Sequence, residues 1–148
     1  MREVSIEKIT LNIGCVITVP IDNAKTVLER LSNSTAVITK TRKRTTFNVP
    51  KDTPIGCKVT IRKNADEFLK NLLEARENKL NERNFDSTGN EALGVKENID
   101  VPSMQYDPKL GILGFDVSVP LKRPGYRVKR KKHPRTVGHS HRITKEEA

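Results

Sequence analysis

Alternation of apolar and polar residues in short segments is the feature that most constrains how this chain folds. In residues 57–63 Cys57, Val59 and Ile61 occupy every second position, and polar residues stand between them. This period of two is typical of a β-strand with one face buried and one face open. We expect strands at 4–13, 35–41, 57–63 and 112–121, and a further short strand near 92–96.

Two segments show the helical period instead. Residues 22–32 place Ala24, Val27, Leu28 and Leu31 on one stripe. Asp22 is a plausible N-cap for this helix. Asn64 with Glu67 resembles a capping box that opens a longer helix, from 64 to about 83. Its buried stripe would be formed by Phe68, Leu69, Leu72, Leu73 and Leu80.

Few of these strands are joined by helices of crossover length, so an antiparallel sheet is favoured over a parallel one. The predicted fold class is α+β, with two main helices packed on one face of the sheet. The chain has 148 residues, 34% of them hydrophobic, which suits one domain with a modest core. We expect this domain to span residues 1–121. Residues 122–148 lose the apolar period and should be extended or disordered unless a partner holds them.

The charge of the chain is segregated. Its net charge is +10, yet residues 122–145 hold ten Lys or Arg and no acid. Residues 40–63 hold eight basic residues and one acid, whereas the remainder is acidic. Two concentrated basic segments are typical of a nucleic-acid binder. Neither segment has an amphipathic helical period and no apolar run could span a bilayer, so a membrane partner is not expected.

Polar strand positions supply a candidate RNA surface. If strand residues 9–13 and 57–63 are neighbours, Thr10, Asn12, Lys58, Thr60 and Arg62 share the sheet face away from the helices. Such side chains can bond to phosphates and 2′-hydroxyls. Lys40 and the loop that follows it would extend this surface beyond the sheet edge, and an ordinary solvated face remains the alternative.

The loop after Lys40 combines three cations with one aromatic residue, Phe47. Phe47 could stack on a base or fold back to anchor the loop, and both interpretations stay open. The C-terminal segment resembles tails that contact phosphates without sequence preference. Its three histidines lack a nearby cysteine, so they support a zinc site only weakly.

Enzyme signatures are missing from the sequence. We find no Gly-rich phosphate loop before a helix and no GxSxG, HExxH or CxxC motif, and we expect no cofactor and no resident metal. Asp100, Asp107 and Asp116 are scattered among turns and give little support to a metal cluster for RNA hydrolysis. Cys15 and Cys57 are expected to be reduced, as in a cytosolic protein.

Several motifs in order resemble one known family. VSIEKITLNIG at 4–14, ITKTRK at 38–43 and PIGCKVTIR at 54–62 are followed by GVKENI at 94–99, YDP at 106–108, GFDV at 114–117 and RPGYRV at 123–128. This series is similar to the L-five family of ribosomal proteins, and the ending HRITKEEA resembles its archaeal members. The resemblance is collinear over nearly the whole chain.

The resemblance implies a structural, non-catalytic protein of the large ribosomal subunit in the cytoplasm. It would attach 5S rRNA to the central protuberance and contact large-subunit rRNA, neighbouring large-subunit proteins, P-site tRNA and, across an intersubunit bridge, a protein of the small-subunit head. By position, the residues facing 5S rRNA would be Thr10, Asn12, Lys40, Lys58, Thr60 and Arg62. The tRNA-facing loop would be Arg42, Lys43, Arg44, Thr45, Thr46 and Phe47.

Two further surfaces complete this interpretation. The resemblance places the bridge loop at Pro102, Ser103, Met104, Gln105, Tyr106, Asp107, Pro108 and Lys109. The basic tail would contact rRNA through Arg123, Arg127, Lys129, Arg130, Lys131, Lys132 and Arg135. The competing hypotheses are an RNA-processing enzyme with metal-bound acids and a free regulator that binds RNA or DNA outside the ribosome.

Overall fold

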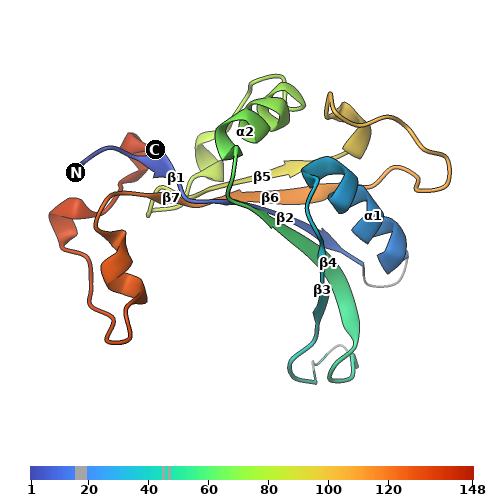
Figure 1. Ribbon diagram of the computed structural model, residues 1–148, viewed down its shortest axis with the longest axis horizontal. Coiled ribbons are helices and arrows are strands. Elements are labelled where there is room, and N and C mark those ends of the chain that lie inside the picture. Colours follow the sequence, from blue (N-terminus) through green and yellow to red (C-terminus); the bar gives the residue numbers. More distant parts are fainter. Residues whose placement is uncertain (16–19, 45, 47) are drawn as a thin grey trace.

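The computed structural model describes residues 1–15, 20–44, 46 and 48–148. A five-stranded antiparallel sheet in the order β3-β4-β2-β6-β5 forms its centre (Figure 1). These strands are β2 (Ile9–Gly14), β3 (Val37–Lys40), β4 (Pro54–Ile61), β5 (Glu91–Val95) and β6 (Phe115–Val119). A separate antiparallel pair joins β1 (Ser5–Ile6) to β7 (Leu121–Lys122).

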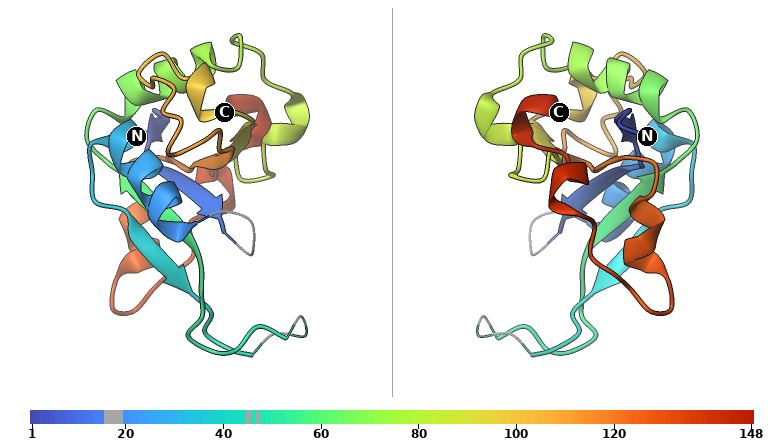
Figure 2. Two further views of the ribbon diagram at one scale, coloured as in Figure 1. Left: turned by 90° about the vertical axis from the view of Figure 1, so that its right-hand side faces the viewer. Right: turned by 90° about the vertical axis from the view of Figure 1, so that its left-hand side faces the viewer.

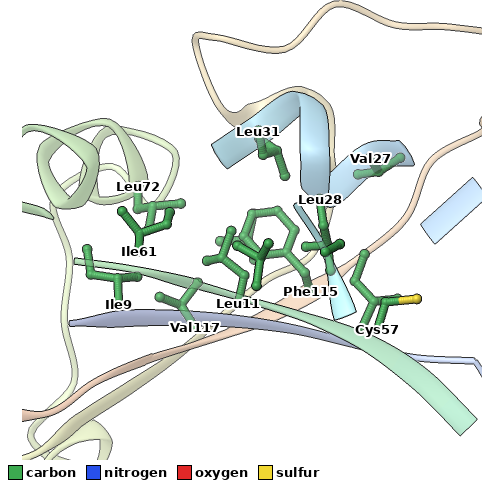
Figure 3. Packing of buried hydrophobic residues seen from close by; sticks show 14 of the residues in the cluster. Ile9, Leu11, Val27, Leu28, Leu31, Cys57, Ile61, Leu72, Phe115 and Val117 are labelled. Atoms are coloured by element: carbon green, nitrogen blue, oxygen red, sulfur yellow. The ribbon is translucent and has the colours of Figure 1, made fainter. Parts of the chain in front are cut away.

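Helices α1 (Ile21–Ser32) and α2 (Ala65–Glu74) cover one face of the sheet (Figure 1). The predicted stripe of α1 is buried, and its Leu28 lies over the strands that carry Leu11 and Phe115 (Figure 3). Leu72 of α2 lies over Ile9 and Ile61. These residues form one hydrophobic cluster. The predicted α+β class, with both helices on one face, is confirmed.

The predicted cap of α1 is wrong, whereas Asn64 stands at the predicted N-cap position of α2 without forming the predicted capping box. Helix α1 begins one residue earlier, with Pro20 at the cap position and Asp22 in the first turn. Asn64 precedes α2 in a left-handed conformation and makes no side-chain cap hydrogen bond. Helix α2 ends at Glu74 rather than near 83, because Glu77 and Asn78 have φ of 54° and 55°, which a right-handed helix cannot contain. Leu80, expected to be buried, is therefore exposed.

Strand boundaries differ from the prediction at two prolines and within residues 4–13. Pro54 opens β4 instead of belonging to a turn before it. Pro120 separates β6 from β7, and its carbonyl accepts a hydrogen bond from the backbone N–H of Glu7 at 3.0 Å. The predicted strand at 4–13 is similarly divided into β1 and β2.

The segment after β7 is folded, which corrects the expectation of an extended or disordered tail. It forms three short 3₁₀ turns, Tyr126–Arg130, His139–His141 and Lys145–Glu147. Val137 is 6% exposed and Ile143 is 2% exposed. No helix in the described part of the chain has the length and apolar character that spanning a membrane requires.

Candidate nucleic-acid interface

The sheet face turned away from α1 and α2, which we call the free face, carries mostly small and polar side chains, with the exposed Val37 of the edge strand opposite Lys58. Thr10 is paired with Thr60 of β4 and with Ser118 of β6. Asn12 is paired in the same way with Lys58 and Asp116. The structure thus brings together Thr10, Asn12, Lys58 and Thr60, as the alternation predicted, and each is exposed or half-buried. Their role in RNA binding stays a prediction.

Two more predicted residues lie at the margins of the free face. Arg62 follows the last residue of β4 and is exposed. Lys40 ends the edge strand β3 and is also exposed. Between these margins, Gly14 is paired with Gly56, whose added Cβ would lie 2.4 Å from the Ile13 carbonyl oxygen. This glycine pair leaves that part of the free face without side chains, which lets a sugar–phosphate chain approach the strands closely.

The hairpin between β3 and β4 projects beyond the sheet (Figure 2). Its base is fastened by Thr41, a buried residue whose Oγ1 donates to the Pro50 carbonyl at 2.6 Å and accepts from the Thr53 N–H at 3.1 Å. Beyond this point the predicted tip residues Arg42, Lys43, Arg44 and Thr46 are exposed. Thr45 and Phe47, also predicted for the tip, lie outside the described residues.

Arg123 is a correction to the predicted RNA-binding tail. It is 4% exposed, and its guanidinium bonds to the carbonyl oxygens of Arg2 and Arg142 at 3.0 Å each. It also forms a 2.8 Å ion pair with Glu147. This pair, with the Thr144 N–H, lowers the pKa of the Glu147 carboxyl. Arg123 therefore holds both ends of the chain together and is not available to a phosphate.

Tyr126 makes a second attachment of the tail. Its hydroxyl donates to the His141 carbonyl at 3.2 Å and accepts from the Ile143 N–H at 2.9 Å. Ile143 then packs against Gly89, where an added Cβ would lie 2.5 Å from the Ile143 Cγ2. Gly89 has φ of 76°, so both its backbone conformation and its neighbour favour glycine. The apolar pair Val137 and Ile143 was a weak signal of this packing in the sequence.

The other predicted tail cations remain exposed. They are Arg127, Lys129, Arg130, Lys131, Lys132 and Arg135. Lys129 lies 4.8 Å from the Tyr126 ring centroid, and Arg130 forms an ion pair with Glu7. A cavity of about 550 Å³ is lined by Arg127, Arg130, Lys131, Lys132 and His133. Its lining is wholly basic or histidine, which suits an anionic group such as a phosphate.

The predicted bridge loop, 102–109, is fastened to α1. Arg30 of α1 forms a 3.0 Å ion pair with Asp107, and the Asn23 amide donates to the Lys109 carbonyl at 3.2 Å. The pKa of Asp107 is lowered, first by the Lys109 N–H and then by Arg30. Asn98, 2% exposed, accepts from the Leu113 N–H at 3.2 Å and so closes the base of the loop.

These attachments leave most of the predicted bridge residues at the surface: Pro102, Ser103, Gln105, Tyr106, Pro108 and Lys109 are exposed, and Met104 and Asp107 are half-buried. Sequence reasoning missed Asn23, Arg30 and Asn98, because an isolated polar residue carries no signal of a contact 15 to 86 residues away.

No group of three His, Cys, Asp or Glu side chains is gathered as metal ligands in the described ranges. Burial raises the pKa values of the Cys15 and Cys57 thiols.

The two basic segments flank the free face. In Figure 1 the hairpin and the tail both extend below the sheet, at opposite ends and away from the helices. Residues far apart in sequence therefore lie on one side of the molecule, with a basic segment at each end of it. A polyanion wide enough to span the sheet could contact both segments and the free face together.

Comparison with known proteins decides the family. Residues 54–148 match the model of the C-terminus of the ribosomal L5 family. The chain is 42% identical to the large ribosomal subunit protein uL5 of Nitrosopumilus maritimus, covering 100% of this chain and 88% of the relative. The chain belongs to the ribosomal L5 family. The uL5 proteins of Sulfolobus acidocaldarius and Methanococcoides burtonii are 41% and 43% identical, over 100% and 99% of this chain and 85% and 89% of theirs. It is an L5 protein of the archaeal type, as the motifs predicted.

Proposed function

We propose that this L5-family protein is a structural constituent of the large subunit of the cytoplasmic ribosome, where its free face binds 5S rRNA and attaches it to the central protuberance. The observation that carries the proposal is the free face itself. Four small or polar side chains and a glycine pair lie there between two basic segments. A dry protein interface would leave these polar groups unpaired, whereas ribose and phosphate can satisfy them.

The two basic segments have different proposed partners. The exposed cations of the tail contact large-subunit rRNA, and the basic lining of their cavity supports this role. The hairpin tip faces P-site tRNA, because Arg42, Lys43 and Arg44 project from the domain with no folding reason to be charged. Loop 102–109 contacts a small-subunit head protein, supported by the exposure of Tyr106 and by the Arg30–Asp107 pair that positions it. Neighbouring large-subunit proteins are further partners, and no catalytic role is proposed.

The proposal is tested by recovering the RNA that the protein selects. The purified chain is mixed with total ribosomal RNA, and the bound RNA is sized and sequenced after washing in high salt. We expect 5S rRNA to be retained and the tagged protein to co-sediment with large subunits in cells. Retention of many RNAs in proportion to their length would contradict the proposal and favour a nonspecific basic regulator.

A Mg²⁺-dependent nuclease activity lost in Asp116→Asn would instead favour the enzyme hypothesis. Asp116 lies on the free face opposite Asn12, so this variant removes the one acid among the paired positions of β2. We expect no RNA cleavage by either protein.

A further inference from the structure

A second cavity lies on the opposite side of the sheet from the free face. It measures about 490 Å³ and is bounded by β1, α2, β5 and the β6–β7 junction. Its apolar walls are Val4, Ile6, Leu69, Phe85, Val119 and Leu121. The side chain of Glu91 points to the same side of β5 as the buried Leu93 and away from the side of the exposed Ala92. The cavity therefore lies on the side of the sheet that the helices cover.

Glu91 is the unusual member of this cavity. It is 7% exposed, and its Oε1 is fully buried without a hydrogen-bond partner in the described part of the chain. Burial raises the pKa of its carboxyl. An ionised carboxylate buried alone is costly to a fold, so a cationic group that enters the cavity and pairs with Glu91 would stabilise its charged form.

The rim of the cavity defines the charge of that group. Asp66 and Glu147 line it together with Glu91, and its lining among the described residues contains no Lys or Arg. Glu147 is already paired with Arg123, so Asp66 and Glu91 are the acids that would repel an RNA phosphate there and attract a cation. These carboxylates do not form a metal-binding group within the described ranges, which favours an organic cation over a metal ion.

We propose that the Glu91 cavity receives a lysine side chain of a neighbouring basic protein. A lysine carries a single ammonium on four methylene groups, which matches one unpartnered carboxylate oxygen at the end of an apolar cavity. Arginine would need two acceptors for its planar fork. The chain's own Lys145 is already engaged, 3.1 Å from Glu82. None of the described residues that line this cavity belongs to the free face.

The first test uses the full chain in solution, with glutamate carboxyls labelled for NMR and end-capped trilysine as the probe. We expect a saturable shift of the Glu91 carboxyl and no shift with the acetylated peptide. Glu91→Gln should weaken trilysine binding at least tenfold, read from the Val119 methyls, and should fold because it removes a buried charge. Glu97→Gln, at an exposed position, is the matched control and should bind normally.

Several results would overturn the proposal. These are an equal Glu91 shift with Mg²⁺, no shift with trilysine, or unchanged trilysine affinity in Glu91→Gln. Binding of 5S rRNA by Glu91→Gln should be unchanged. Loss of 5S rRNA selection with intact trilysine binding would therefore contradict the proposed function and leave the cavity assignment standing.

The second test identifies the partner in assembled large subunits. A carbodiimide joins a carboxyl to an adjacent lysine amine as an amide, and the carbodiimide takes up the water that is lost. Mass spectrometry should find Glu91 joined to a lysine of another ribosomal protein. A link from Glu91 to a lysine of this chain, or reaction at Glu97 with none at Glu91, would contradict the proposal.

Discussion

The two basic segments have similar charge but are held to the body in different ways. The hairpin is fastened at its base by Thr41, and its described tip residues point into solvent. The tail is attached along its length by Arg123, Tyr126 and Ile143. In both segments a high density of cations is suited to a polyanion. Charge alone does not predict whether a segment also stabilises the fold.

Ile143→Ala should give the largest loss of stability. Ile143 is 2% exposed and packs on Gly89, so its truncation should cost about 2–4 kcal/mol by loss of burial and creation of a cavity. Denaturant unfolding measures this. Ile112→Ala, at a position 52% exposed, should change stability little and serves as the control. Equal effects of the two changes would show that the tail does not pack on the domain.

Replacing Lys43, Arg44 and Phe47 together by Ala should leave unfolding and 5S rRNA binding nearly unchanged. The same change should weaken P-site tRNA held by assembled ribosomes by about 1–2 kcal/mol, if one stacking or charged contact is lost. The tRNA dissociation rate is the measurement. Impaired 5S rRNA binding with normal tRNA dissociation would move the tip to the 5S rRNA surface.

Thr41→Val tests whether the base of the hairpin depends on one hydroxyl. The substitution keeps the shape of the residue but removes the bonds of Oγ1 to Pro50 and Thr53. We expect a loss of about 1 kcal/mol in stability and faster amide exchange at Asp52 and Thr53. Thr35→Val, at an exposed position before β3, is the control. Unchanged exchange would mean that the hairpin is held by other contacts.

The smallest effect should be the pH dependence of the tail attachment. Arg123 lowers the pKa of Glu147 below its ordinary value of 4.5, so the ionised carboxylate stabilises the folded state above that value. The stabilisation should be lost as pH falls through the lowered pKa. The melting temperature of the wild type should therefore exceed that of Glu147→Gln at pH 6, and the difference should vanish in acid. A difference that persists at pH 2 would contradict the Arg123–Glu147 pair. The loss of stability caused by Thr41→Val should not depend on pH.

Local patterns predicted where most strands lie and which of their side chains share a face, but not the order of the strands in the sheet. Alternation placed Thr10, Asn12, Lys58 and Thr60 on one face because side-chain direction in a strand has a period of two. The same patterns failed where a contact joins distant segments. Arg123 was interpreted as an RNA contact because its partners, Arg2 and Glu147, lie 121 residues before it and 24 after it. The end of α2 was missed because the left-handed residues that stop it, Glu77 and Asn78, are not glycines.

The central claim, that the free face is the 5S rRNA surface, is tested most directly by the salt dependence of binding. Lys58→Ala with Arg62→Ala removes two cations from this face and its margin, and Lys25→Ala with Lys70→Ala removes two from the helices on the other side. Affinity for 5S rRNA should fall only in the first pair, and the slope of log affinity against log salt should decrease by up to about two units. Unchanged affinity and slope in the first pair, or equal changes in both pairs, would contradict the account.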